Sequence, residues 1–220
     1  MTSRGSGGVK LAATIATVSA ALWFLHPWTV RPIDGVSANG GDPAARVDRD
    51  WSSTVRPALM ASAVDVRAVV DALRASPGSA RARFGRADGA GGWYVVVRGT
   101  GRVLSIDRIS AAGVARIDLA PYDDREDLSL QVGPVIRGSA LRDATDLVPF
   151  NNFPNQLAYA DAANALNARA FRDVLERAVS TLGPGQLVTF VAAGTTDAPE
   201  GSQLAGLVPI DLSVEGRGRE

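Results

Sequence analysis

Seven polar side chains between positions 137 and 156 are the best candidates in the sequence for binding a ligand. They are Arg137, Arg142, Asp143, Asn151, Asn152, Asn155 and Gln156. The planar guanidinium of arginine suits a carboxylate, a phosphate or a vicinal diol, and side-chain amides both donate and accept hydrogen bonds. This palette predicts a site for a sugar or a small anion, with Arg137 and Arg142 as the first expected contacts. The alternative is structural, because Arg142 and Asp143 could form internal salt bridges while the asparagines cap turns and helices.

A second polar group is the acidic run from Tyr122 to Asp127. Its carboxylates are the ligands that a hard cation such as Ca²⁺ prefers, but the run lacks the alternating Asp positions and central Gly of an EF-hand loop. A pair of carboxylates also serves glycoside hydrolysis, which requires one of them to have a raised pKa. A charged loop seldom provides the burial that raises a pKa. A solvated turn is therefore the preferred interpretation, and a carboxylate-dependent hydrolase is the least favoured function.

The residue types that are missing exclude several chemistries. The 220 residues include 23 basic and 23 acidic side chains, one histidine and no cysteine. The histidine, His26, and the single lysine, Lys10, both precede residue 31. Positions 31–220 therefore exclude a Ser-His-Asp triad, a cysteine nucleophile, a Schiff-base lysine and a zinc site built on His or Cys. The zero net charge also argues against nucleic acid as a partner.

The N-terminal 30 residues have the character of a targeting segment. Arg4 and Lys10 precede an apolar stretch from Leu11 to Val30, whose 20 residues match the ~20 that a helix needs to cross a bilayer. Basic residues before the stretch predict that residues 31–220 lie outside the cytoplasm. A cleaved signal peptide and a buried soluble helix are the alternatives. We expect an uncleaved signal anchor in a single-pass cell-membrane protein.

A linker and one folded domain are expected to follow this segment. Residues 31–41 have the Pro, Gly, Ser and Asn content of a linker. Residues 42–214 suffice for a single extracytoplasmic domain with its own core, and residues 215–220 form a polar tail. No internal repeat interrupts this organisation.

The first part of the domain, residues 42–88, is predicted to be helical. Val47, Trp51 and Val55 recur every four residues on one face, and Pro57 should end or kink that helix. A second helix is expected to begin near Asp65.

The second part, residues 93–214, changes to a strand pattern. A long strand begins at Trp93 and is interrupted by Gly99 and Gly101, which suggests a bulge or a sharp coil. Two more strands, a helical region and two final strands follow. That order predicts an α+β protein in which N-terminal helices precede an OB-like five-stranded β-barrel, with the helical insertion between strands three and four. A mixed sheet with helices on one face is the alternative.

Three segments of the second part also resemble a known family. They are V-R-G-T-G-R-V (97–103), Q-V-G-P-V-I-R-G-S-A-L-R-D-A (131–144) and F-N-N-F-P-N-Q-L-A-Y-A-D (150–161). Together with D-P-A-A-R-V-D-R-D-W (42–51) they resemble domain of unknown function 2291, a family of predicted periplasmic lipoproteins. The resemblance implies an extracytoplasmic, membrane-tethered protein often encoded beside sugar ABC-type uptake systems. It supplies no established catalytic residues. Because the chain has no cysteine to carry a lipid, the tether would have to be the apolar N-terminal helix.

The expected function is a non-enzymatic, membrane-anchored accessory or small-ligand-binding module linked to sugar uptake. The expected partners are the membrane, a sugar or small anion, and components of an ABC-type transporter, with no cofactor and no metal. A cell-envelope protein-interaction module without a small-molecule ligand is the alternative from a different class.

Overall fold

The computed structural model describes residues 42–87, 93–195 and 204–215. The predicted signal anchor (1–30), the linker (31–41) and most of the predicted polar tail lie outside the described residues. Within the described ranges, no helix is long and apolar enough to cross a membrane.

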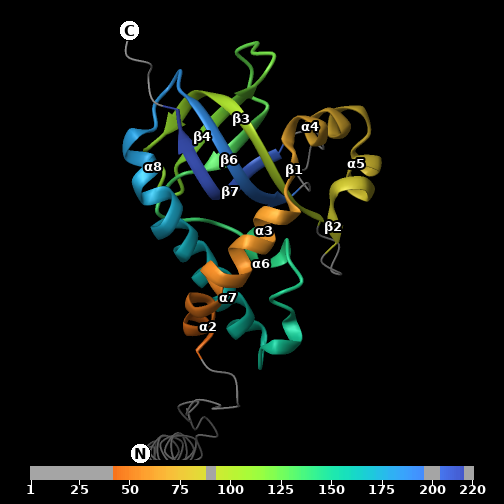
Figure 1. Cartoon of the computed structure of the whole chain (residues 1–220), viewed down its shortest axis with the longest axis vertical. Coiled ribbons are helices and arrows are strands. Elements are labelled where there is room, and N and C mark those ends of the chain that lie inside the picture. The colour runs from red at the N-terminus through yellow and green to blue at the C-terminus, as the bar shows by residue number, and fades with distance from the viewer. Residues whose placement is uncertain (1–41, 88–92, 196–203, 216–220) are drawn as a thin grey trace, which may run out of the picture. The chain divides into compact units, whose positions relative to one another are not determined.

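Five strands form a closed ring (Figure 1). They are β3 (Trp93–Asp107), β4 (Val114–Leu119), β5 (Leu128–Gln131), β6 (Leu187–Thr195) and β7 (Leu204–Val214). The order around the ring is β3-β4-β5-β7-β6, and β6 then pairs with β3. Only the pairing of β5 with β7 is parallel among these five. The predicted OB-like arrangement is therefore confirmed, and the single-faced mixed sheet is not adopted.

The strand β3 is long enough to pair with both β4 and β6, and these two pairings close the ring. Its 15 residues pair with β6 from Tyr94 to Arg102 and with β4 from Gly101 to Asp107. The register against β4 shifts between Val103 and Ser105, so the irregularity lies just beyond the two glycines where a bulge was expected. Gly99 serves another purpose. A Cβ at this position would overlap a methyl group of Val66, so the glycine lets a helix approach the strand closely.

The N-terminal section is mainly helical, as predicted. It comprises α2 (Pro43–Asp50), the π-helical turn η1 (Trp51–Val55), α3 (Arg56–Ser62), β1 (Val64–Asp65), α4 (Val66–Ala75), α5 (Pro77–Phe84) and β2 (Arg86–Ala87). Pro57 does not end the helical run; it lies in the first turn of α3, directly after the π-helical turn. Asp65 caps α4 by accepting a hydrogen bond of 2.9 Å from the Ala68 amide. The two short strands β1 and β2 pair with β3 and were not predicted.

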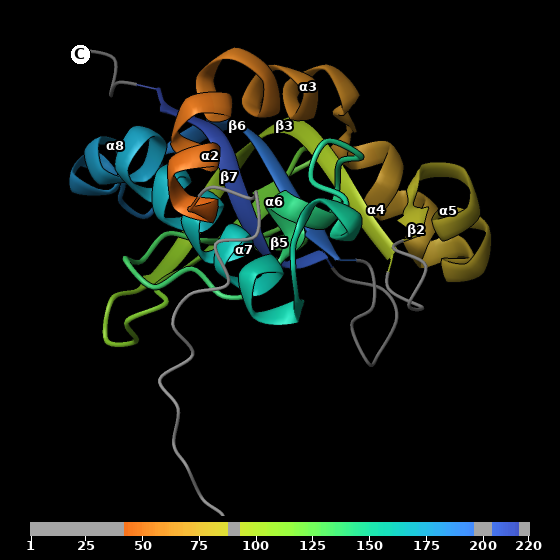
Figure 2. The same ribbon diagram turned by 90° about the horizontal axis from the view of Figure 1, so that it is seen from below.

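A second helical region is inserted between β5 and β6. It contains α6 (Ala140–Asp143), η2 (Phe150–Asn152), α7 (Gln156–Ala170), η3 (Phe171–Leu175) and α8 (Glu176–Thr181). The helix α7 lies against α2 at the end of the unit away from the strand ring (Figures 1 and 2).

Two hydrophobic cores result from this arrangement. One lies inside the ring and includes Ile117, Leu130 and Phe190. The other joins the helices to the outer face of β3, β6 and β7, and includes Trp51 and Ile210. Alternate residues of β3 serve the two cores because successive strand side chains point to opposite faces. The second core holds α2, α3, α6 and α7 together, and the candidate site lies at its edge.

Candidate functional site

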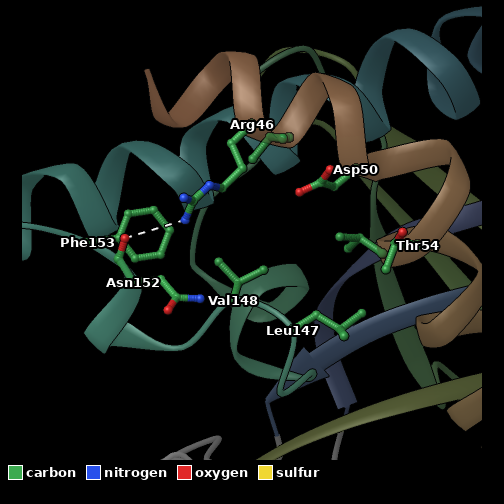
Figure 3. A pocket seen from close by; sticks show the side chains of 9 residues that line it. Arg46, Asp50, Thr54, Leu147, Val148, Asn152 and Phe153 are labelled. Carbon is green, nitrogen blue, oxygen red and sulfur yellow. Dashed lines mark hydrogen bonds between the residues drawn. The ribbon is translucent and has the colours of Figure 1, made fainter. Parts of the chain in front are cut away.

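A cavity of about 390 Å³ lies between the first helices and the loop that leads into α7. One wall comes from α2 and η1, and the opposite wall comes from residues 147–153 (Figure 3). The lining residues are Arg46, Val47, Asp50, Thr54, Val55, Leu147, Val148, Asn152 and Phe153. The cavity therefore combines charged and amide groups with an apolar, partly aromatic surface.

Helical spacing places the polar lining residues on one side of α2 and η1. Arg46, Asp50 and Thr54 recur every four residues, and each directly precedes one of the buried residues Val47, Trp51 and Val55. Residues four apart are neighbours on a helix surface. Burial of the apolar stripe in the second core therefore turns the polar stripe toward the loop opposite.

The polar groups of the pocket differ in how they are engaged. Nη1 of Arg46 donates a long hydrogen bond of 3.4 Å to the carbonyl oxygen of Asn152, and its guanidinium carbon lies 5.9 Å from the ring centre of Phe153. In the part of the chain that the structure describes, the Asp50 carboxylate and the Asn152 side-chain amide have no hydrogen-bond or ion-pair partner. Asp50 offers acceptors, and Asn152 offers a donor and an acceptor, to a ligand in the cavity.

Arg142 and Asp143, two of the sequence-predicted site residues, are engaged within the protein. Nε and Nη2 of Arg142 donate to the two carboxylate oxygens of Asp143 at 2.7 and 2.9 Å. Nη1 of Arg142 donates to the carbonyl oxygen of Tyr159 at 3.0 Å, and the Tyr159 hydroxyl donates to Asp143 at 3.2 Å. The guanidinium carbon also lies 3.6 Å from the centre of the Tyr159 ring. The structural alternative considered for these two residues is therefore the arrangement present.

The charges of this network shift its pKa values. Burial alone raises the pKa of Asp143, but the hydrogen bonds and charge of Arg142 outweigh burial and hold that pKa below its ordinary value. Burial raises the pKa of the Tyr159 hydroxyl, and the Asp143 charge adds to this effect. At neutral pH, Arg142 and Asp143 therefore form an ionised pair, and the Tyr159 hydroxyl that donates to Asp143 stays protonated.

The same network positions one wall of the cavity. The Tyr159 ring contacts Phe150 edge-on with centroids 5.2 Å apart, and it contacts Phe153 at 5.4 Å. Phe150 and Phe153 flank Asn152 in the sequence. Arg142 and Asp143 therefore hold the loop that carries a pocket residue, without lining the pocket themselves.

The remaining sequence-predicted residues lie apart from one another. Arg137 is exposed, and its backbone amide and carbonyl are bound by the Gln131 side chain at 2.8 and 3.0 Å. Asn155 caps α7 by accepting from the Ala158 amide at 2.8 Å, while Asn151 and Gln156 are exposed. Asn152 is the one predicted residue that lines the cavity. Ligand contact by the others stays a prediction.

Sequence reasoning missed Arg46, Asp50 and Thr54. Their signal was present as a polar stripe beside the apolar stripe of the first predicted helix. The sequence could not indicate that residues 147–153, about 100 positions farther along the chain, lie opposite that polar stripe.

Asp124 and Asp127 in the acidic run from Tyr122 to Asp127 form ion pairs with arginines from other elements. The buried Asp118 accepts from Arg102 at 2.7 Å, and the same Arg102 donates to Asp124 at 2.8 Å. Asp127 is 4% exposed, pairs with Arg74 and accepts from the Leu119 amide at 2.7 Å. The expected solvated turn therefore describes the exposed Asp124 but not Asp127. Across the described ranges, no cluster of three metal-ligating side chains forms.

Comparisons with known proteins agree with this architecture. A family model described as "Predicted periplasmic lipoprotein (DUF2291)" matches residues 18–213. Among solved structures, an OB-fold protein from Thermotoga maritima is similar, with 21% sequence identity and a TM-score of 0.65. That similarity covers 80% of this chain and 99% of the other. No curated protein matches the sequence. The structural similarity supports the OB fold.

Proposed function

This chain belongs to the DUF2291 family of predicted periplasmic lipoproteins, and we propose that it is a non-enzymatic, extracytoplasmic binding module. Its ligand would be a small polyhydroxylated molecule such as a sugar, held in the cavity between α2 and residues 147–153. It would act as an accessory of a sugar ABC-type uptake system, which the family resemblance implies.

The observation that carries this proposal is the unpartnered Asp50 carboxylate opposite Asn152 in a partly apolar cavity. Sugar hydroxyls both donate and accept hydrogen bonds, so a carboxylate, an amide and a guanidinium together can satisfy several of them. The Phe153 ring supplies a surface for the apolar face of a sugar ring. The cavity volume of about 390 Å³ falls in the range of about 300–1,000 Å³ typical of small-molecule sites.

The electrostatics of the carboxylates favour binding over hydrolysis. Burial raises the pKa of Asp118, but hydrogen bonds from Arg102 and from backbone amides outweigh burial and lower it. A general acid for glycoside hydrolysis requires the opposite shift. Asp124 and Asp127 form ion pairs with Arg102 and Arg74, so their oxygens are already engaged within the protein.

The proposed tether is the apolar segment from Leu11 to Val30. The family description names a lipoprotein, but this chain has no cysteine on which a lipid could be placed. An uncleaved helix would retain the domain at the membrane, next to the transporter components with which we expect it to work.

Ligand binding can be tested with the full-length chain in detergent micelles by thermal shift against monosaccharides, polyols and sugar phosphates. We expect at least one sugar to raise the melting temperature of the wild type. Asp50→Asn should weaken its binding by roughly tenfold or more, because a hydrogen bond to a charged group contributes roughly 1.5–3 kcal/mol.

Asp161→Asn is the matched control. Asp161 is exposed on α7, outside the cavity, so its neutralisation should leave the ligand-induced shift unchanged. The proposal fails if no compound stabilises the wild type, or if the two variants respond alike.

A further inference from the structure

The loop before α7 and the first turn of α7 expose an unusual amount of apolar surface. Leu147, Phe150 and Leu157, here called the apolar rim, are 43%, 45% and 71% exposed. They are three of the six large hydrophobic residues that are exposed in the part of the chain that the structure describes. Single exposed apolar residues are normal. The other three such residues, Ile109, Tyr122 and Val135, are spread along the chain, whereas these three fall within 11 positions.

The apolar rim lies beside the point where the chain enters the folded unit. The first described helix, α2, begins at Pro43, and its Arg46 hydrogen-bonds the Asn152 carbonyl and lies over the Phe153 ring. Asp48 of α2 is paired with Arg169 and Arg172 farther along the insertion, at 3.4 and 3.2 Å. These contacts fix the start of the domain to the insertion that carries the rim. Figure 1 shows α2 and α7 at the end away from the strand ring.

We propose that the apolar rim faces the lipid bilayer and inserts its side chains among the lipid headgroups. This inference rests on the proposed function in one respect, the membrane anchor at Leu11 to Val30. Linker residues 31–41 can span at most about 40 Å when fully extended, so the start of α2 stays near the membrane. Tethering gives the rim a high effective concentration at the lipid surface, so weak apolar contacts suffice to orient the domain.

The charges around the rim indicate how it would bind lipid. Asp146 and Asp161 carry negative charge, and Arg86 and Arg46 carry positive charge, in the same region. Such a mixed surface has no strong attraction to anionic headgroups. Contact with the bilayer should therefore depend on apolar insertion and should occur on neutral, zwitterionic lipid. In this orientation the cavity, which shares Leu147 with the rim, lies near the membrane plane.

The absence of cysteine allows a direct test by site-specific labelling. In Leu157→Cys, a polarity-sensitive fluorophore would report on the rim, and the substitution should be tolerated because Leu157 is largely exposed. Ile109→Cys is the matched control, since Ile109 is 100% exposed on the loop between β3 and β4. The helices α7, η3 and α8 form one run from Gln156 to Thr181. Arg108, next to Ile109, donates a hydrogen bond of 2.7 Å to the carbonyl oxygen of Leu182, which directly follows that run. Position 109 therefore lies near the end of the run opposite to position 157. At 1.5 Å per residue, that run separates the two probes by roughly 35 Å.

The full-length labelled chains would be reconstituted into phosphatidylcholine vesicles at low protein density. We expect a blue-shifted emission at position 157, quenched by headgroup-labelled lipid, and a water-like emission at position 109. Equal, water-like emission at both positions would overturn the proposal. Shielding at 157 that disappears as the protein is diluted in lipid would also overturn it, because the occupant would then be a second copy of the chain.

Flotation of the same vesicles tests the anchor separately. A chain that floats but leaves position 157 in water disproves the bilayer contact alone. A chain that does not float disproves the anchor. Neither result depends on the sugar-induced thermal shift, which is measured without vesicles.

Discussion

Asp50 and Asp143 show how the same side chain acquires different roles in this molecule. Asp143 is buried and receives hydrogen bonds from Arg142 and Tyr159. Asp50 lines a cavity and has no partner among the described residues. A carboxylate whose oxygens are already occupied stabilises the fold, whereas one whose oxygens are free can bind a ligand. This contrast is the basis for assigning Asp143 a structural role and for proposing Asp50 as a ligand contact.

The Arg142–Asp143 pair should make the stability of the domain depend on pH in the acid range. The pKa of Asp143 is lower in the folded state than its ordinary value. Such a group contributes stability above its unfolded pKa of about 3.9 and loses that contribution as pH falls through the lower folded pKa. We expect Asp143→Asn to lower the free energy of unfolding by about 3 kcal/mol at pH 7, because it leaves the Arg142 charge without its partner.

The measurement is denaturant unfolding of both proteins between pH 2.5 and pH 7. The difference between wild type and Asp143→Asn should be constant above about pH 5 and should shrink below about pH 4. A difference that does not shrink between pH 5 and pH 2.5 would show that the carboxylate charge is not what stabilises the pair.

At the scale of elements, the approach of α4 to β3 is set by one glycine. A Cβ at Gly99 would overlap a methyl group of Val66, the first residue of α4, which is 2% exposed. Gly99→Ala should therefore lower the free energy of unfolding by about 1–3 kcal/mol through overpacking. Denaturant unfolding measures this loss, and adding Val66→Ala should recover part of it because the two side chains compete for one space.

Gly78→Ala is the control for this prediction. Gly78 lies in α5, and a Cβ there meets nothing within 4 Å. Alanine should stabilise that helix by about 0.4–1 kcal/mol. Equal effects at positions 78 and 99 would mean that close packing against Val66 is not the constraint.

The elements were largely predictable because their signals are local. The change from helical spacing around Trp51 to a β-branched run at Trp93 separates the two sections of the domain. The position of the helical insertion then distinguishes an OB-like order from other arrangements. The short strands β1 and β2 were not predictable, since two residues carry no periodicity and their pairing depends on β3.

The site was harder to predict than the fold because it is formed by distant segments. The polar residues between 137 and 156 were recognised by type, yet the position of Tyr159 over Arg142 decides that Arg142 is engaged internally. The contact between Arg46 and Asn152 joins residues 106 positions apart. No spacing rule within one segment indicates such a contact, and only Asn152 of the seven candidates lines the cavity.

At the scale of the whole molecule, the strand ring and the cavity lie in different parts of the domain. The ring is a closed structure with its own core, and similarity to an OB-fold protein extends over 80% of the chain. The cavity and the apolar rim lie instead on the helical layer where the chain enters the domain. The proposed ligand site and the proposed bilayer contact would thus occupy the same end of the molecule.

Hydrogen–deuterium exchange of the full-length chain, with and without the sugar that gives the largest thermal shift, tests the position of the site most directly. The account predicts slower exchange in peptides that cover residues 42–55 and 144–153, the two walls of the cavity, with no change in the strand ring. Protection confined to residues 131–143, around Arg137 and Arg142, or no protection at all would contradict it.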